Sequence, residues 1–224
     1  TGAFKEEICL MLNEHDSLYQ GIAALGLSIA QEKVELLLKF NQLIRKWNKV
    51  YNLTAIRDPI EMVQLHLLDS LAVVAHIGLG RIADIGTGAG LPGIPLAIVK
   101  PENEFVLLDS NAKKTRFVQQ AVVELKLHNV TVVTGRVEQF QSEQKFDFVV
   151  SRAFASMPEI RRLTAHLLSD TGELLAMKGM PDAQELCIDI DSYSIIPLNV
   201  PGIDAERCLI KMPALQNKGT LWEK

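Results

Sequence analysis

The segment DIGTGAGLPGIP, residues 84–95, contains four glycines and follows a short apolar run that begins at residue 81. Glycine-rich turns between a strand and a helix are typical binding sites for nucleotide-containing cofactors, because the backbone can approach the ligand closely. Counted from Gly88, the segment reads G-x-G-x-x-G, which is typical of dinucleotide-binding enzymes. Counted from Asp84, it reads acid-x-G-x-G-x-G, which suits a cofactor without phosphates. The two patterns predict two different classes of enzyme.

The position of the glycines favours the pattern that begins at Asp84. In dinucleotide-binding enzymes the first glycine follows the strand at once, whereas a match from Gly88 leaves two residues unused. Pro92 and Pro95 also remove backbone N–H groups from the start of the next helix, where a pyrophosphate would bind. A helix tolerates both prolines only in its first turn, so we expect it to begin near Leu91. We therefore interpret the loop as a binding site for S-adenosylmethionine.

Two carboxylates extend this site. Asp109 ends the next apolar run, 23 residues after Gly86, and at this separation a carboxylate accepts hydrogen bonds from both ribose hydroxyls of a cofactor. Both cofactor classes contain that diol, so Asp109 does not distinguish them. Asp84 has two compatible interpretations, which are contact with the cofactor and anchoring of the loop through backbone N–H groups. Glu138 either contacts the adenine edge or only begins a helix.

The organisation of the chain changes near residue 78. Residues 28–78 have apolar side chains at spacings of three and four, which is typical of amphipathic helices, and Asp58-Pro59 indicates the start of a second helix. From residue 81 short apolar runs alternate with helical patterns, which favours parallel pairing. The last two runs, YSIIPLNV and RCLIKM, are joined by a loop too short for a helix, which predicts an antiparallel hairpin.

We therefore expect an α/β fold of the class I methyltransferase type. It consists of a Rossmann-like, doubly wound sheet with a C-terminal antiparallel hairpin in residues 79–224. An N-terminal helical extension forms a cap in residues 1–78.

Composition restricts the partners and the cellular location. The 224 residues carry a net charge of −4, so binding to nucleic acid requires a local basic patch. The chain has no apolar run long enough to span a membrane and no signal-peptide pattern, so we expect a cytoplasmic protein without a membrane partner. Three distant cysteines and five histidines show no metal-ligand spacing, so we expect no metal. No oligomer interface is indicated, and we expect a monomer.

The run that ends in SRAF, residues 151–154, restricts the acceptor. It lacks the Asp/Asn-Pro-Pro-aromatic stretch that is common in enzymes that methylate exocyclic amines, and no cysteine is near for carbon methylation. This favours an acceptor that is already nucleophilic, such as an aromatic ring nitrogen. Arg152, at the expected catalytic end of a central strand, is the candidate catalytic residue because a guanidinium can contact phosphate or stack on a base.

Six segments also resemble one known family. They are WNKVYNLTAIRDP (47–59), HLLDSL (66–71), DIGTGAGLPGIPLAI (84–98), LLDSNAKKTRF (107–117), GRVEQF (135–140) and SRAFAS (151–156). In this order they resemble the RsmG family, also called GidB, of bacterial 16S ribosomal RNA guanine-N7 methyltransferases. The resemblance implies methyl transfer from S-adenosylmethionine to a guanine ring N7, with 16S rRNA or the small ribosomal subunit as partner.

The resemblance also implies that five residues bind the cofactor: Gly86, Leu91, Val137, Glu138 and Arg152. In this position Arg152 serves the cofactor, the substrate or both. The full set of candidate cofactor-binding residues is Asp84, Gly86, Gly88, Gly90, Leu91, Asp109, Val137, Glu138 and Arg152. Two alternatives stay open, a nucleotide-dependent oxidoreductase and a non-catalytic RNA-binding module on the same fold.

Overall fold

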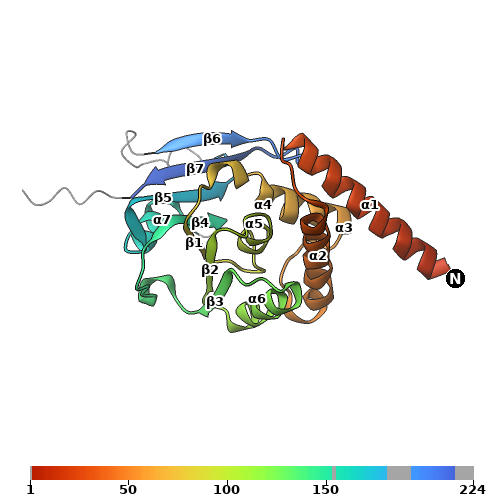
Figure 1. Ribbon diagram of the computed structural model, residues 1–224, viewed down its shortest axis with the longest axis horizontal. Coiled ribbons are helices and arrows are strands. Elements are labelled where there is room, and N and C mark those ends of the chain that lie inside the picture. The colour runs from red at the N-terminus through yellow and green to blue at the C-terminus, as the bar shows by residue number, and fades with distance from the viewer. Residues whose placement is uncertain (1, 153–154, 181–192, 215–224) are drawn as a thin grey trace, which may run out of the picture.

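The computed structural model describes residues 2–152, 155–180 and 193–214 (Figure 1). At its centre lies a seven-stranded sheet with the strand order β3-β2-β1-β4-β5-β7-β6. The strands are β1 (Arg81–Ile85), β2 (Glu104–Asp109), β3 (Val130–Thr134), β4 (Phe146–Arg152), β5 (Leu168–Lys178), β6 (Ser194–Leu198) and β7 (Arg207–Pro213).

The central strands are parallel and the last two are not. β1 pairs in parallel with β2 and β4, and Asp84 lies opposite Leu107 and Val150. β3 and β5 extend the parallel sheet on either side. β7 runs antiparallel to both β5 and β6. The predicted doubly wound sheet with a C-terminal antiparallel hairpin is therefore confirmed.

Helices cover both faces of this sheet. α5 (Gly93–Val99) and α6 (Ala112–Leu125) connect parallel strands, and α2 (Gln31–Tyr51) packs against both of them. These three helices share one apolar core with one sheet face, in which Phe40 and Phe117 are fully buried. α7 (Met157–Thr164) belongs to a second core on the opposite face.

The long N-terminal helix α1 (Gly2–Ala24) extends outward at the edge of the molecule (Figure 1). Its end near the sheet is fixed by burial of Leu18 and by Glu14, whose carboxylate accepts a 2.6 Å hydrogen bond from Arg45 of α2. Leu18 belongs to the same core as the sheet. The division of the chain into two domains at residue 78 stays a prediction. Apolar side chains from both sides of this position pack in one core. No described helix is long and apolar enough to cross a membrane.

The helix after the glycine loop begins at Gly93, with Pro92 at the N-cap and Pro95 in the first turn. This is two residues beyond the expected start at Leu91. Both prolines lie where the backbone N–H has no partner within the helix, which is the reason the sequence tolerates them there.

The segment from residue 59 to residue 76 differs from the single regular helix expected from its apolar spacing. α3 (Pro59–Met62) begins as predicted after Asp58 and leads into a π-helical stretch, η1 (Val63–Leu68). The short α4 (Asp69–Leu71) and the 3-10 turn η2 (Val74–His76) complete the segment. In η1 the carbonyl of Leu65 accepts a hydrogen bond from the side chain of Arg152, and side-chain insertion of this kind interrupts regular helix bonding.

Candidate active site

The glycine loop is held by the carboxylate beneath it. Asp84 at the end of β1 is fully buried, and its Oδ2 accepts hydrogen bonds from the Thr87 hydroxyl at 2.6 Å and the Gly93 N–H at 2.8 Å. Gly88 and Gly90 have φ values of +59° and +83°, which side chains rarely adopt. The loop-anchoring interpretation of Asp84 is therefore visible in the structure, while direct contact with a cofactor stays a prediction.

The second carboxylate oxygen of Asp84 has no hydrogen-bond partner among the described residues. Burial raises the pKa of this carboxyl to about 6, against the opposing effect of its hydrogen bonds from Thr87 and Gly93. A cation placed over the loop would favour the ionised form. The loop is thus better suited to a positively charged ligand than to an anionic one.

Asp109 joins the end of β2 to the same loop. Its Oδ2 accepts the N–H of Gly88 at 2.9 Å, and its Oδ1 accepts the N–H of Asn111 at 2.8 Å. Two backbone donors fix the orientation of the carboxylate. Each oxygen keeps a lone pair for a further donor such as a ligand hydroxyl.

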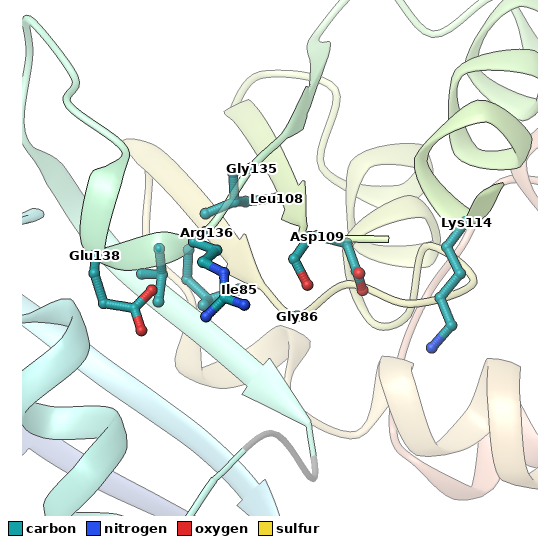
Figure 2. A pocket seen from close by; sticks show the side chains of 10 residues that line it. Ile85, Gly86, Leu108, Asp109, Lys114, Gly135, Arg136 and Glu138 are labelled. Carbon is teal, nitrogen blue, oxygen red and sulfur yellow. The ribbon is translucent and has the colours of Figure 1, made fainter. Parts of the chain in front are cut away.

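A cavity of about 410 Å³ lies at the carboxyl ends of β1, β2 and β3, and we call it the first cavity (Figure 2). Its lining includes four of the predicted residues, Gly86, Asp109, Val137 and Glu138. The other lining residues are Ile85, Leu108, Ser110, Lys114, Gly135 and Arg136. Figure 2 shows Asp109 and Gly86 between Lys114 on one side and the pair Arg136 and Glu138 on the other.

The structure separates the remaining predicted residues from this cavity. Gly88, Gly90 and Leu91 shape the loop but do not line the first cavity, and Leu91 is buried with its N–H bonded to the Thr87 carbonyl. Asp84 lies beneath the loop. Arg152 lines a different cavity.

That second cavity, of about 530 Å³, lies where β4 and β5 end and β7 begins. Its polar lining includes His66, Asp69, Arg152, Lys178 and Arg207. The rest of the lining is formed by Thr54, Ala55, Ile56, Leu65, Met177 and Gly179. Because β1 and β4 are neighbours in the sheet, the two cavities lie at neighbouring strand ends.

Arg152 is held in the second cavity by the irregular helical segment. Its Nη1 donates to the Leu65 carbonyl at 2.7 Å and to Asp69 Oδ2 at 2.9 Å. Arg207 Nε lies 3.6 Å from Asp69 Oδ1. The buried carboxylate of Asp69 thus lies between two guanidinium groups that come from β4 and β7.

His66 is buried beside this cluster, and its Nε2 lies 3.1 Å from the Thr54 hydroxyl. Burial, aided by the positive charge of Arg152, lowers the pKa of His66 to about 4. The imidazole is therefore neutral at pH 7, and its contact with Thr54 connects η1 to the loop after α2.

Sequence reasoning missed His66, Asp69 and Arg207 as site residues. A signal for the first two was present, since both belong to the segment HLLDSL that carries part of the family resemblance. Arg207 precedes an apolar run and gave no local signal. Arg136 and Lys114 also line the first cavity and are not among the predicted cofactor-binding residues.

Comparison with known proteins places this geometry in a family. The family model GidB, described as rRNA small subunit methyltransferase G, matches residues 33–209. The chain belongs to the GidB family. The protein named ribosomal RNA small subunit methyltransferase G from Chromobacterium violaceum is 49% identical over 199 residues, which cover 87% of this chain and 95% of that protein. The protein of the same name from Methylococcus capsulatus is 50% identical over 198 residues, covering 87% and 96%.

Solved structures agree with this GidB assignment at the level of fold. The N-methyltransferase NodS from Bradyrhizobium japonicum, in complex with S-adenosylhomocysteine, superposes with a TM-score of 0.53 at 14% identity and covers 76% of this chain and 99% of its own. An S-adenosylmethionine-dependent methyltransferase from Aquifex aeolicus gives a TM-score of 0.52 at 16% identity, covering 66% and 92%. The predicted family, the methyltransferase enzyme class and the methyltransferase fold are confirmed.

The residues of the first cavity fit S-adenosylmethionine. Its lining offers two carboxylates, Asp109 and Glu138, for hydroxyl and amine donors, and apolar side chains for a purine ring. The unpartnered oxygen of Asp84 lies beneath the same loop. Pro92 at the start of α5 leaves few N–H donors for a pyrophosphate. In the described ranges no group of three or more His, Cys, Asp or Glu side chains could hold a metal ion.

Proposed function

We propose that this GidB-family chain transfers a methyl group from S-adenosylmethionine to N7 of a guanine in 16S rRNA, acting as a monomer in the cytoplasm. The observation that carries the proposal is the pair of cavities at neighbouring strand ends, one with carboxylates and the other rich in cations. A single chain supplies both cavities, which supports a monomeric enzyme. The names of the relatives support small-subunit rRNA as the substrate.

In the first cavity, we infer that Asp109 accepts hydrogen bonds from the ribose hydroxyls and that Glu138 accepts one from the adenine amine. Val137 and Gly86 contact the adenosine, while Gly88, Gly90 and Leu91 act through the shape of the loop. Asp84 acts from beneath as the buried negative charge. S-adenosylmethionine supplies an electrophilic methyl group on a positively charged sulfur.

In the second cavity, we infer that the acceptor base binds beside Arg152. Among the described residues the lining contains no cysteine or serine, and its histidine is neutral and in contact with Thr54. Guanine N7 carries a free lone pair, so the reaction requires no general base. The contribution of the chain is then positioning, which can supply about 7–11 kcal/mol of a reaction barrier.

Local basic groups support an RNA substrate despite the net charge of −4. Beyond the second cavity lies a smaller one of about 340 Å³, whose lining includes Arg45, Lys49 and Arg57. The two cavities share Ile56 in their linings, so the cavities adjoin each other and each has cationic side chains in its lining. A strand of RNA could contact this region through its phosphates.

Transfer of tritium from labelled S-adenosylmethionine tests the proposal. Purified 16S rRNA and small ribosomal subunits are each offered as acceptor, and the methylated base is located by strand cleavage at N7-methylguanine. We expect one guanine to be labelled. Binding of RNA without transfer would instead support a non-catalytic module.

Calorimetric binding of NAD in preference to S-adenosylhomocysteine would support the oxidoreductase alternative. Light scattering with and without RNA measures the molar mass in solution and so tests whether the protein is a monomer.

A further inference from the structure

The carboxylate of Asp69 in the second cavity has one oxygen, Oδ1, that accepts no hydrogen bond from the described residues and has only the longer ion-pair contact with Arg207. Asp69 is 5% exposed, and its Oδ2 accepts the hydrogen bond from Arg152. Its Oδ1 has no hydrogen-bond partner among the described residues, since Arg207 Nε lies at 3.6 Å. A buried carboxylate oxygen without a partner is costly unless a ligand supplies a donor. Asp69 also lines the second cavity, so its carboxylate is within reach of a molecule bound there.

The chemistry of this acceptor matches guanine. The Watson–Crick edge of guanine presents two adjacent donors, N1–H and the N2 amine, and a carboxylate can accept from both. Adenine presents the lone pair of its N1 at the same place, which a carboxylate repels. Uracil and cytosine each offer a single donor on this edge. A carboxylate that faces the edge thus selects guanine over the other three bases.

The size and lining of the cavity suit a base removed from its stack. Enzymes that modify bases extrude the target into a pocket and read its Watson–Crick edge there. The volume of about 530 Å³ is within the range of small-molecule sites, and Ile56 and Met177 supply apolar surface for a ring. N7 lies on the side of the purine opposite to N1 and N2. Binding through the Watson–Crick edge therefore leaves N7 accessible.

We propose that the second cavity binds a flipped-out guanine and that Asp69 determines specificity by accepting hydrogen bonds from its N1–H and N2 amine. This inference rests on the proposed function and adds the residue that selects the base. Arg152 and Arg207 hold the carboxylate from two sides, so its orientation is fixed before the base enters.

Substitution at single atoms of the substrate tests the contact directly. Once the methylated guanine has been located, RNA is prepared with inosine at that position, which removes only the N2 amine, or with 1-methylguanosine, which blocks N1. With the unmodified enzyme we expect kcat/KM to fall about 10- to 100-fold for inosine, because a hydrogen bond to a charged group is lost. For 1-methylguanosine we expect a larger loss, since the methyl group also collides with the carboxylate.

The Asp69→Asn variant should lose this discrimination. Its overall activity will be lower, but its ratio of kcat/KM for guanosine over inosine should approach one. Arg207→Gln is the matched control, because it removes one ion-pair partner while the Asp69 carboxylate remains and is still held by the hydrogen bond from Arg152. We expect it to keep the guanosine preference. Calorimetry with S-adenosylhomocysteine shows for each variant that the first cavity is intact.

Two results would overturn the inference. One is equal use of guanosine and inosine RNA by the unmodified enzyme, which requires no variant to fold. The other is an unchanged guanosine preference in Asp69→Asn. Failure of the proposed function has a different signature, because the unmodified enzyme would then transfer no methyl group to any small-subunit RNA.

Discussion

The carboxylate of Asp109 accepts the backbone N–H of Gly88 at 2.9 Å, and this contact joins the end of β2 to the loop that leaves β1. A second bond, from the N–H of Asn111, fixes the other oxygen of the same carboxylate. The loop and the start of α6 thus meet at one side chain. The first cavity is built around it, so its shape depends on the register between β1 and β2.

The Asp109→Asn substitution should weaken binding of S-adenosylhomocysteine about 10- to 100-fold, because charged hydrogen bonds to the ribose hydroxyls are lost. Isothermal calorimetry measures the affinity. Glu104→Gln is the control, since Glu104 is an exposed carboxylate at the opposite end of the same strand. Equal affinity in both variants and the unmodified protein would remove Asp109 from the site.

Arg152→Ala should reduce the rate of methyl transfer about 100- to 1,000-fold, the usual effect of removing one donor that positions reacting groups. Because Arg152 lines the second cavity, affinity for S-adenosylhomocysteine should change by no more than about twofold. Single-turnover tritium transfer and calorimetry separate the two effects. Arg152→Lys keeps the charge but loses the planar geometry, so it should restore little activity. A parallel loss of cofactor affinity would show that Arg152 contacts the cofactor, as the family resemblance also allows.

The raised pKa of Asp84 predicts a dependence of stability on pH. The carboxyl of Asp84 has a pKa of about 6 in the folded protein, against 3.8 for a solvent-exposed aspartate in the unfolded chain. Between these values Asp84 is more protonated in the native state, so its contribution to the free energy of unfolding falls as pH rises from about 4 to about 6 and is then constant. The shift corresponds to a loss on the order of 3 kcal/mol.

Urea unfolding of the unmodified protein and of Asp84→Asn, each from pH 4 to pH 8, measures this contribution. The amide cannot ionise, so the difference between the two curves should change across that window and stay level above it. The substitution also alters hydrogen bonding at every pH. For this reason we compare how the free energy of unfolding changes with pH in the two proteins, and not its absolute value. Parallel curves would show that Asp84 has no raised pKa.

Gly93→Ala should destabilise the protein by about 1–3 kcal/mol, the usual cost of overpacking. A Cβ at this position would lie 2.6 Å from Asp84 Oδ2 and 2.8 Å from Leu107 Cγ. Gly135→Ala is the matched control, because a Cβ there meets no atom within 4 Å. The midpoints of urea unfolding provide the comparison. Similar midpoints for the two variants would indicate that the loop can shift to accept a side chain.

Much of the first cavity was predictable from the sequence because it is built from contiguous segments. Apolar runs that alternate with helical spacing indicated parallel strands, and parallel strands bring their carboxyl ends to one edge. Gly86 directly follows β1, Asp109 ends β2, and Val137 and Glu138 lie three and four residues after the end of β3; all four line the cavity. The order of strands and loops along the sequence was therefore sufficient to predict these four residues of the first cavity. The two roles open for Asp84 could not be separated in this way, since burial beneath the loop depends on how α5 packs.

The sequence by itself determined the sheet, its hairpin and the ligand-binding loop, because strand and turn preferences act between near neighbours in the chain. Only the tertiary structure decided that Arg152 faces Asp69 and Arg207, residues 83 and 55 positions away, and not the first cavity. It also decided that residues 63–68 form a π-helix around the Leu65 carbonyl. These features depend on charged side chains that come into contact only after β4, β7 and the N-terminal helices have packed together. The spacing of residues along the chain does not predict such contacts.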